Sequence, residues 1–364
     1  MSGTETAIDA AGLETYLSGE LDIDVGETRV LNDGLNLTLV ISTANDEQRY
    51  VLRRPNKLRR TDLFIGVKRE YRVLRALGDA SIPTPEPVLF CDDASVIGNS
   101  FFVTTFLEGS TIPLGSDLPE RFQNETSRND VAANLIETLA AIHSLDVSPF
   151  EECCNRQSPL NQIDRATARL DETATVTGRE FPLLRSVAEW LRQNVPEESK
   201  RTVVHGDFRP GNVLFAAGDS PEITGVLDWE TAMIGDPQTE LGYLLLRWRD
   251  ENDPTPPLDE LEARYSNEDA IQQLRAANEN GLAPFTMRPG SPSRRELVTR
   301  YEDETGIEFE NERFYRAHAA LMLATVWADL HRHRIEAGNE SHWEPHVEYM
   351  ARIAHSIVTG EFEL

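Results

Sequence analysis

The stretch from Val203 to Glu230, VVHGDFRPGNVLFAAGDSPEITGVLDWE, constrains the fold of this chain more than any other. An apolar pair ends at His205, after which glycine and proline mark a tight turn. Two short apolar segments follow, at 213–215 and 223–227, and the turn-rich AAGDSPE joins them. This pattern predicts a pair of short strands. The pair places three polar side chains at strand ends, namely Asp207, Asn212 and Asp228.

These three side chains are of the types that magnesium-dependent phosphoryl transfer needs. Asp207 and Asn212 have the D-x-x-x-x-N spacing of a kinase catalytic loop, and Asp228 follows the next apolar strand, where a kinase holds its metal aspartate. Mg²⁺ prefers hard oxygen ligands. We therefore predict that Asp207 aligns the acceptor hydroxyl and receives its proton, and that Asn212 and Asp228 bind Mg²⁺. The alternative is two polar hairpin turns, because Asp, Asn and Gly are common in turns.

The motifs HGDFRPGN and VLDWE resemble those of the aminoglycoside phosphotransferase and choline kinase-like family, the small-molecule branch of the protein-kinase-like fold. The later GDPQTELGY is similar to the family's G-D-P-x-x-D-L motif, with Glu240 where aspartate is usual. The likeness covers most of the chain and is strongest to the phosphotransferase branch also found fused to acyl-CoA dehydrogenases. It implies a two-lobed α+β fold, with a small antiparallel-sheet lobe over residues 1–107 and a larger, mainly helical lobe over 108–364.

The resemblance implies that the first lobe binds a nucleotide. Alternating apolar residues predict a hairpin that would cover the phosphates, with Gly34 and Asn36 at its bend, although a simple hairpin bend explains these two residues equally well. Arg53 ends the second strand, where this fold places a phosphate-binding lysine. Glu70, on a helix predicted over 62–77, would form an ion pair with Arg53.

Further site residues follow from the same resemblance. The backbone of Thr105, Phe106 and Leu107, between the lobes, would face the adenine base. His205 is expected to orient the loop around Asp207 through hydrogen bonds, and Asp236 to brace that loop. Arg209 is close enough to Asp207 in sequence to contact a phosphate or the substrate.

An insertion at about 251–295 is the main departure from the family pattern. We expect either a lid above the acceptor or a flexible segment without function. Arg288, Arg294 and Arg295 cluster at its end. They are a candidate site for an anionic group of the acceptor, and a basic helix start on the surface is the alternative.

The chain is strongly acidic: its 62 acidic and 35 basic residues give a net charge of −27. Only three of the basic residues are lysines, namely Lys57, Lys68 and Lys200. This composition resembles that of proteins from salt-accumulating halophiles, in which carboxylates maintain solubility. It argues against nucleic-acid binding.

The chain has no apolar run long enough for a membrane span and does not begin like a signal peptide, so we expect a cytoplasmic protein.

The sequence thus predicts an enzyme that transfers the γ-phosphate of ATP or GTP, with Mg²⁺, to a hydroxyl of a small molecule. Two alternatives stay open. The first is a catalytically silent nucleotide-binding module, which is favoured by the glycine-poor hairpin and by Arg53, an arginine where lysine is usual. The intact set of Asp207, Asn212 and Asp228 argues against it. The other alternative is a kinase that acts on a macromolecule.

Overall fold

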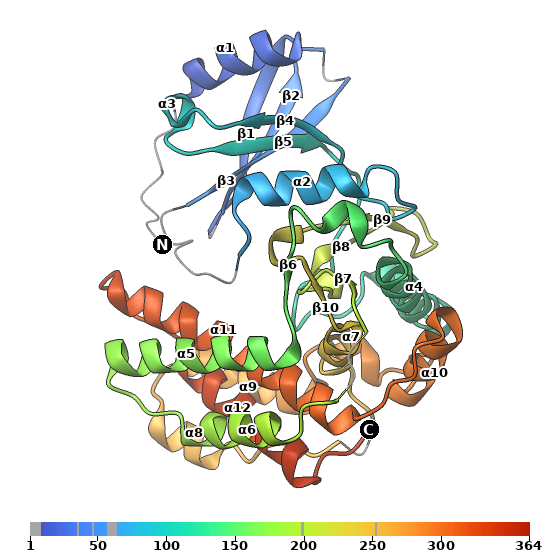
Figure 1. Cartoon of the computed structure of the whole chain (residues 1–364), viewed down its shortest axis with the longest axis vertical. Coiled ribbons are helices and arrows are strands. Elements are labelled where there is room, and N and C mark those ends of the chain that lie inside the picture. The colour runs from blue at the N-terminus through green and yellow to red at the C-terminus, as the bar shows by residue number, and fades with distance from the viewer. Residues whose placement is uncertain (1–8, 35, 46, 57–63, 198–199, 252) are drawn as a thin grey trace.

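The structure, a computed structural model, describes residues 9–34, 36–45, 47–56, 64–197, 200–251 and 253–364. A sheet-containing lobe lies above a larger helical lobe (Figure 1). This arrangement confirms the predicted two-lobed α+β fold, with an antiparallel sheet in the first lobe. Every helix in the described residues is too short or too polar to cross a lipid bilayer.

The first lobe is built on a five-stranded antiparallel sheet in the order β1-β2-β3-β5-β4. Its strands are β1 (Val25–Asp33), β2 (Asn36–Thr43), β3 (Arg49–Pro55), β4 (Pro87–Cys91) and β5 (Phe101–Thr105). Side chains on β5 alternate between the two faces of the sheet. Phe101 and Val103 join a core with α1 (Ala10–Leu21) and α3 (Ala94–Ile97), whereas Phe102 joins the core that includes α2.

Helix α2 (Val67–Leu77) lies between the sheet and the second lobe (Figure 1). It was predicted over 62–77, and of that range residues 62 and 63 lie outside the described part of the chain. Its buried side chains recur at helical spacing, which is typical of a helix with one apolar face. They are Val67, Glu70, Val73, Leu74 and Leu77. Glu70 is the one charged member of this face, so its carboxylate needs a partner.

The second lobe is mainly helical. Its helices are α4 (Glu125–His143), α5 (Pro159–Thr177), α6 (Pro182–Gln193), α7 (Pro237–Leu245), α8 (Asp259–Arg264), α9 (Glu268–Asn280), α10 (Arg294–Thr305), α11 (Glu312–Glu336) and α12 (Glu344–Thr359). Helix α11 is largely buried and packs against α5, α7 and α12. Short 3-10 turns lie at Glu120–Phe122, Ser148–Phe150, Pro210–Asn212, Trp229–Thr231 and Pro284–Met287.

Short strands at the top of the second lobe hold the predicted motif. β7 (Thr202–Val204) pairs with β10 (Met233–Gly235), which also pairs with β6 (Asn155–Arg156). β8 (Val213–Phe215) and β9 (Ile223–Val226) form the predicted antiparallel pair, with Val213 opposite Val226. As a result, the residues that follow β7 and β9 meet beneath the first lobe.

The described residues of the insertion at 251–295 are packed against the second lobe. Leu261, Ile271, Leu274 and Phe285 are buried in the main core, and α9 packs against α12, so the segment is a packed part of the lobe. Arg294 is only 2% exposed and forms ion pairs with Asp250 and Asp253. A guanidinium group that is buried and already paired in this way is a structural element of the lobe.

Candidate active site

The loop at residues 205–212, called the HGD loop below, leaves β7 through a turn that requires glycine. Gly206 has a φ of +86°, and a Cβ at this position would lie 2.5 Å from the carbonyl oxygen of Thr231. Glycine alone tolerates both conditions. The ring of His205 then ties the loop to β9, because its Nε2 lies 2.7 Å from the Leu227 carbonyl and its Nδ1 accepts from the Asp207 amide at 3.2 Å. These bonds are the orienting contacts expected of His205.

Three side chains contact the carboxylate of Asp207. The amide of Asn212 donates from 2.8 Å, Arg209 Nε forms an ion pair at 3.1 Å, and the hydroxyl of Tyr243 donates from 2.5 Å. Arg209 therefore contacts Asp207 itself. Tyr243 was not among the residues predicted from the sequence. It lies on α7, seven residues after Asp236. Predicting a helix for GDPQTELGY would have placed Asp236 and Tyr243 on the same face of that helix.

The hydroxyl of Tyr243 is maintained in its protonated form. Burial raises the pKa of Tyr243 well above its ordinary value, and the neighbouring Asp207 adds to the increase. The guanidinium of Arg247 acts in the opposite direction, lying 3.9 Å from the ring centroid of Tyr243 and donating to its hydroxyl at 2.6 Å. A protonated phenol donates to Asp207 and holds that carboxylate in one orientation.

Asp228 is at the end of β9 in the left-handed region, with a φ of 63°. This conformation is costly for a residue with a Cβ and is often found at functional sites. Arg53, from the first lobe, donates to Asp228 and to Glu230. The predicted ion pair of Arg53 with Glu70 is also present, at 3.1 Å. Arg53 thus joins three carboxylates from both lobes.

The charges of this cluster stabilise one another. Burial would lower the pKa of Arg53, but the three carboxylates outweigh it and raise that pKa above its ordinary value. Burial would likewise raise the pKa of Asp228. The Arg53 guanidinium, helped by His205 and Arg209, holds that pKa below its usual range instead. Asp228 is therefore ionised at neutral pH, as a cation ligand must be.

The hairpin between β1 and β2 reaches toward the same cluster. The Gly34 amide donates to the Asn36 carbonyl at 3.2 Å within the turn, and the side-chain amide of Asn36 donates to Glu230 at 2.9 Å. Asn36 thus links the hairpin to the carboxylates of the second lobe.

The segment between the lobes has one amide that differs from its neighbours. The backbone N–H groups of Thr105 and Phe106 donate to the carbonyls of Glu86 and Arg49, at 2.9 and 3.0 Å. Among the described residues, the N–H of Leu107 has no such acceptor. Of the three residues predicted to face a base, Leu107 is therefore the one with a backbone donor available.

Glu240 braces the HGD loop directly. The Glu240 carboxylate accepts from the amides of His205, Gly206 and Phe208 at 2.9, 2.6 and 3.3 Å, and lies 3.1 Å from His143 Nε2. Asp236 acts one step away, by capping the start of α7 and accepting from the Tyr315 hydroxyl at 2.6 Å.

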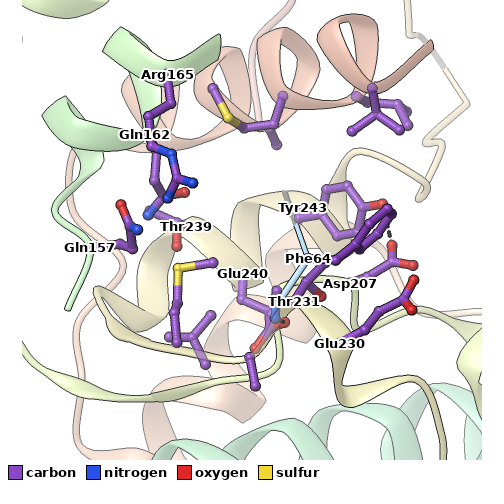
Figure 2. Close-up of a pocket in the computed structure, with 18 of the residues that line it drawn as sticks. Phe64, Gln157, Gln162, Arg165, Asp207, Glu230, Thr231, Thr239, Glu240 and Tyr243 are labelled. Carbon is purple, nitrogen blue, oxygen red and sulfur yellow. Dashed lines mark hydrogen bonds between the residues drawn. The ribbon is translucent and has the colours of Figure 1, made fainter. Parts of the chain in front are cut away.

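A cavity of about 220 Å³ extends from Asp207 into the second lobe (Figure 2). Asp207, Asp228, Glu230 and Tyr243 are part of its lining. Further lining residues come from α5 and α11, from β6 and from the residue that follows it. They are Asn155, Gln157, Gln162, Arg165, Arg169, His318, Ala319, Met322, Leu323 and Val326. No local pattern pointed to them, because α5 and α11 are far from the HGD loop along the chain. Among the described residues, neither the insertion at 251–295 nor its arginines line this cavity.

A comparison of the sequence with known families identifies the chain. The sequence pattern of the phosphotransferase enzyme family matches residues 27–277. The chain belongs to this family. It is therefore a phosphotransferase, and the match includes both the HGD loop and Asp228.

Solved structures of similar fold support the kinase-like assignment. A protein from Ralstonia eutropha, provisionally described as an aminoglycoside phosphotransferase, aligns over 98% of this chain and 100% of its own with a TM-score of 0.72 and 22% identity. Plasmodium vivax ethanolamine kinase aligns over 96% of this chain and 88% of its own, with a TM-score of 0.58 and 14% identity. Aminoglycoside phosphotransferase APH(4)-Ia, solved with AMP-PNP and hygromycin B, aligns over 96% of this chain and 98% of its own. The TM-score is 0.58 and the identity is 15%. At these identities the likeness shows the fold alone.

Among curated proteins, acyl-CoA dehydrogenase family member 11 of Gallus gallus is 35% identical over 181 residues, which are 49% of this chain and 22% of that protein. The probable acyl-CoA dehydrogenase IBR3 of Arabidopsis thaliana is 31% identical over 222 residues, 57% of this chain and 26% of that protein. The chain thus spans about a quarter of the length of these relatives.

Proposed function

We propose that this phosphotransferase moves the γ-phosphate of ATP or GTP to a hydroxyl of a small molecule in a Mg²⁺-dependent reaction. The observation that carries the proposal is that Asp207 and Asp228 line one cavity, that Asn212 donates to Asp207, and that Arg53 of the first lobe pairs with Asp228. These are the base, metal-ligand and phosphate-binding groups that phosphoryl transfer requires.

The donor atoms fit Mg²⁺. Asp228 offers an ionised carboxylate, since Arg53 holds its pKa low. Asn212 commits its amide nitrogen to the carboxylate and backbone carbonyl of Asp207, at 2.8 and 2.9 Å. Its amide oxygen is therefore the atom left for a cation. Mg²⁺ bound there would neutralise charge on the transferring phosphates.

The chain's own residues supply the remaining functions. Asp207, fixed by Asn212 and Tyr243, aligns the acceptor hydroxyl and accepts its proton. Arg53, held by Glu70, provides positive charge for the nucleotide phosphates. The hairpin bend at Gly34 and Asn36 lies over these phosphates, and the N–H of Leu107 donates to the base.

The cavity favours a small acceptor over a macromolecule. Its volume of about 220 Å³ and its position inside the second lobe suit a compact molecule. The descriptions of two structural neighbours, ethanolamine kinase and the phosphotransferase solved with hygromycin B, each name a small molecule. The silent-module alternative conflicts with the oriented carboxylate of Asp207 and the ionised carboxylate of Asp228.

The decisive experiment measures consumption of Mg-ATP and Mg-GTP in molar KCl with a panel of hydroxyl compounds. We expect one acceptor class to stimulate turnover, and EDTA to abolish it. Nucleotide that binds with Mg²⁺ but is not turned over with any acceptor would select the silent module. Transfer to a purified protein but to no metabolite would select the macromolecular kinase.

Tyr243→Phe is expected to lower kcat roughly tenfold with little change in the KM for nucleotide. The substitution removes one hydrogen bond to the charged Asp207, and such bonds contribute about 1.5–3 kcal/mol. Steady-state kinetics check the result. Tyr265→Phe, which removes a hydrogen bond to Glu348 away from the cavity, is the control. An unchanged kcat in Tyr243→Phe would show that Asn212 and Arg209 orient Asp207 without help.

Arg53→Lys is expected to raise the KM for nucleotide roughly tenfold, about 1.4 kcal/mol. A lysine is a point charge and cannot bridge Glu230 and Asp228 as the planar guanidinium does. Nucleotide titration of turnover measures the effect, with Arg29→Lys on the exposed face of β1 as the matched control. Faster turnover in Arg53→Lys would instead show that arginine impairs this site.

We further propose that the protein works in the potassium-rich cytoplasm of a halophile. Its 62 acidic residues repel one another, and salt screens this repulsion. We expect Tm to rise steadily as KCl increases toward molar concentrations. Differential scanning calorimetry measures it, and a Tm that falls over this range would contradict the halophilic assignment.

A further inference from the structure

The carboxylate of Asp207 is fully engaged by its protein donors. A carboxylate has four lone-pair positions, two on each oxygen. Its Oδ1 accepts from the Tyr243 hydroxyl at 2.5 Å (Figure 2) and from Arg209 Nε at 3.3 Å. Its Oδ2 accepts from the Asn212 amide at 2.8 Å and from the same Arg209 N–H at 3.1 Å. An acceptor hydroxyl must therefore displace one of these three donors before it can donate to Asp207.

Arg209 is the donor that can leave most easily. Asn212 is 2% exposed and is fixed by a second bond, to the backbone carbonyl of Asp207 at 2.9 Å. The Tyr243 hydroxyl is held in place by Arg247 at 2.6 Å. The side chain of Arg209, in contrast, is 28% exposed, and its Nη1 and Nη2 make no hydrogen bond to any described residue. Its ion pair with Asp207 is long and partly exposed, and such pairs are weak.

A glycine provides the space that Arg209 occupies beside Asp207. A Cβ at Gly211 would lie 2.0 Å from Nη1 of Arg209, much closer than two non-bonded atoms can approach. The φ of Gly211 is not positive, so the backbone itself does not require glycine at this position. The absence of a side chain at Gly211 is therefore what allows the guanidinium to lie against the HGD loop.

The nucleotide of the proposed reaction supplies an anion that competes with Asp207 for Arg209. The γ-phosphate must lie beside the acceptor hydroxyl, and hence beside Asp207, for transfer to occur. Burial would lower the pKa of Arg209, but Asp207, with smaller contributions from Tyr243 and Asp228, raises it. Arg209 thus lies in the field of both the proposed base and the proposed metal ligand.

A phosphate satisfies the guanidinium of Arg209 better than Asp207 does. In the present position only Nε of Arg209 bonds to the carboxylate, through one N–H shared by both oxygens. A phosphate oxygen pair accepts two parallel N–H bonds from the planar fork of an arginine, and these charge-assisted bonds are short and strong. The exchange of one weak contact for two strong ones favours the departure of Arg209 from Asp207.

We propose that Arg209 occupies the acceptor's position on Asp207 in the nucleotide-free enzyme, and that the γ-phosphate of the bound nucleotide draws it away. Nucleotide then binds before the acceptor, whose hydroxyl meets Asp207 only when a phosphate is in place for transfer. This inference rests on the proposed function and adds the order of substrate binding to it. Nucleotide and acceptor each favour the state in which Arg209 has left Asp207, so each strengthens the binding of the other.

Two variants separate the blocking of Asp207 from the binding of phosphate. Arg209→Met removes both roles. Gly211→Ala keeps the charge but pushes the guanidinium aside, because the clash is with the far end of a flexible side chain. The matched controls are Gly218→Ala, whose added Cβ meets nothing within 4 Å, and Arg185→Met, which removes an arginine paired with Asp171 outside the cavity. Thermal denaturation confirms that each variant is folded.

The first measurement needs no acceptor. Mg-AMP-PNP, Mg-GMP-PNP, Mg-ADP and Mg-GDP are titrated into the full-length protein in molar KCl by isothermal titration calorimetry. Arg209→Met is expected to weaken binding of the preferred triphosphate analogue roughly tenfold, and binding of the matching diphosphate by less than about threefold, because the diphosphate lacks the γ-phosphate. Gly211→Ala should bind the triphosphate analogue at least as tightly as wild type, since its arginine no longer has to leave Asp207.

The second measurement uses the acceptor that stimulates turnover in the panel described above. Ligand-observed NMR gives its affinity with and without the triphosphate analogue. Wild type is expected to bind it at least roughly tenfold more tightly when the analogue is present. In Gly211→Ala and Arg209→Met this difference should fall below about threefold, because Asp207 is open from the start. A merely structural role of Arg209 would change both affinities equally.

Equal losses of triphosphate and diphosphate affinity in Arg209→Met would overturn the inference. Turnover by a wild-type enzyme that binds its acceptor equally well without nucleotide would also overturn it and leave the proposed reaction standing. In a protein that turns over no acceptor, a loss confined to the triphosphate analogue would support the movement of Arg209 and reject only the proposed reaction. A wild-type protein that binds none of the four nucleotides would reject both.

Discussion

Replacing Asp207 with asparagine is expected to lower kcat by roughly 10²- to 10⁴-fold, the range for loss of a general base. Asparagine has nearly the same shape and still accepts the hydrogen bond that Tyr243 donates at 2.5 Å. It cannot accept the proton of the acceptor hydroxyl. The two groups proposed to bind the nucleotide and its metal, Arg53 and Asp228, pair with each other. Their positions do not depend on Asp207, so nucleotide affinity should change little. Coupled turnover assays and equilibrium nucleotide binding measure the two quantities separately.

Asp164→Asn provides the matched control, since Asp164 is an aspartate on α5 that pairs with Arg192 outside the cavity. It should leave kcat and nucleotide binding unchanged. Near wild-type turnover in Asp207→Asn would remove Asp207 from the mechanism. Loss of nucleotide binding in step with turnover would assign Asp207 to ligand binding instead of proton transfer.

Replacing Glu240 with alanine is expected to reduce the free energy of unfolding by about 3–5 kcal/mol, as for other buried charged networks that lose one partner. Glu240 is 2% exposed, and its carboxylate accepts from three amides of the HGD loop. Its removal leaves those amides and the ring of His143 without that acceptor. Chemical denaturation measures the loss, and turnover should fall with it because the loop carries Asp207.

The pH dependence of stability provides a second test of Glu240. Burial would raise its pKa, but His143, with a smaller contribution from His205, holds it below the ordinary value. A carboxylate whose folded pKa is lowered stabilises the protein above its unfolded pKa of about 4.3 and loses this contribution as the pH falls through the folded pKa. Glu240→Ala should therefore show a weaker acid-induced loss of stability than wild type.

Glu189→Ala on the exposed side of α6 is the control for these measurements and should behave like wild type. Glu240→Asp restores the residue usual in the related motif and is one methylene shorter. If Glu240→Asp is as stable as wild type, the HGD loop adjusts to the shorter side chain. A loss below about 1 kcal/mol in Glu240→Ala would show that water replaces the carboxylate, since a buried pair loses more.

The sequence determined the parts of this protein that depend on short-range chemistry. HGDFRPGN placed Asp207 and Asn212 on one turn, where the local geometry brings them to 2.8 Å. The strand pair that precedes Asp228 could be predicted because apolar runs and turn residues alternate over a few positions. Arg53 and Glu70 were found through their places on a strand and a helix of a resembling family, and their ion pair is present.

Only the tertiary structure decided which distant side chains meet. Glu240 reaches back to amides 32–35 residues earlier, and its helix is positioned by packing against α11. Arg165 and His318 line one cavity although 153 residues separate them, because α5 and α11 pack together. Side-chain packing between helices depends on the whole core, which no local pattern encodes. The proposed reacting groups could therefore be predicted from the sequence, whereas the cavity beside them was visible only in the fold.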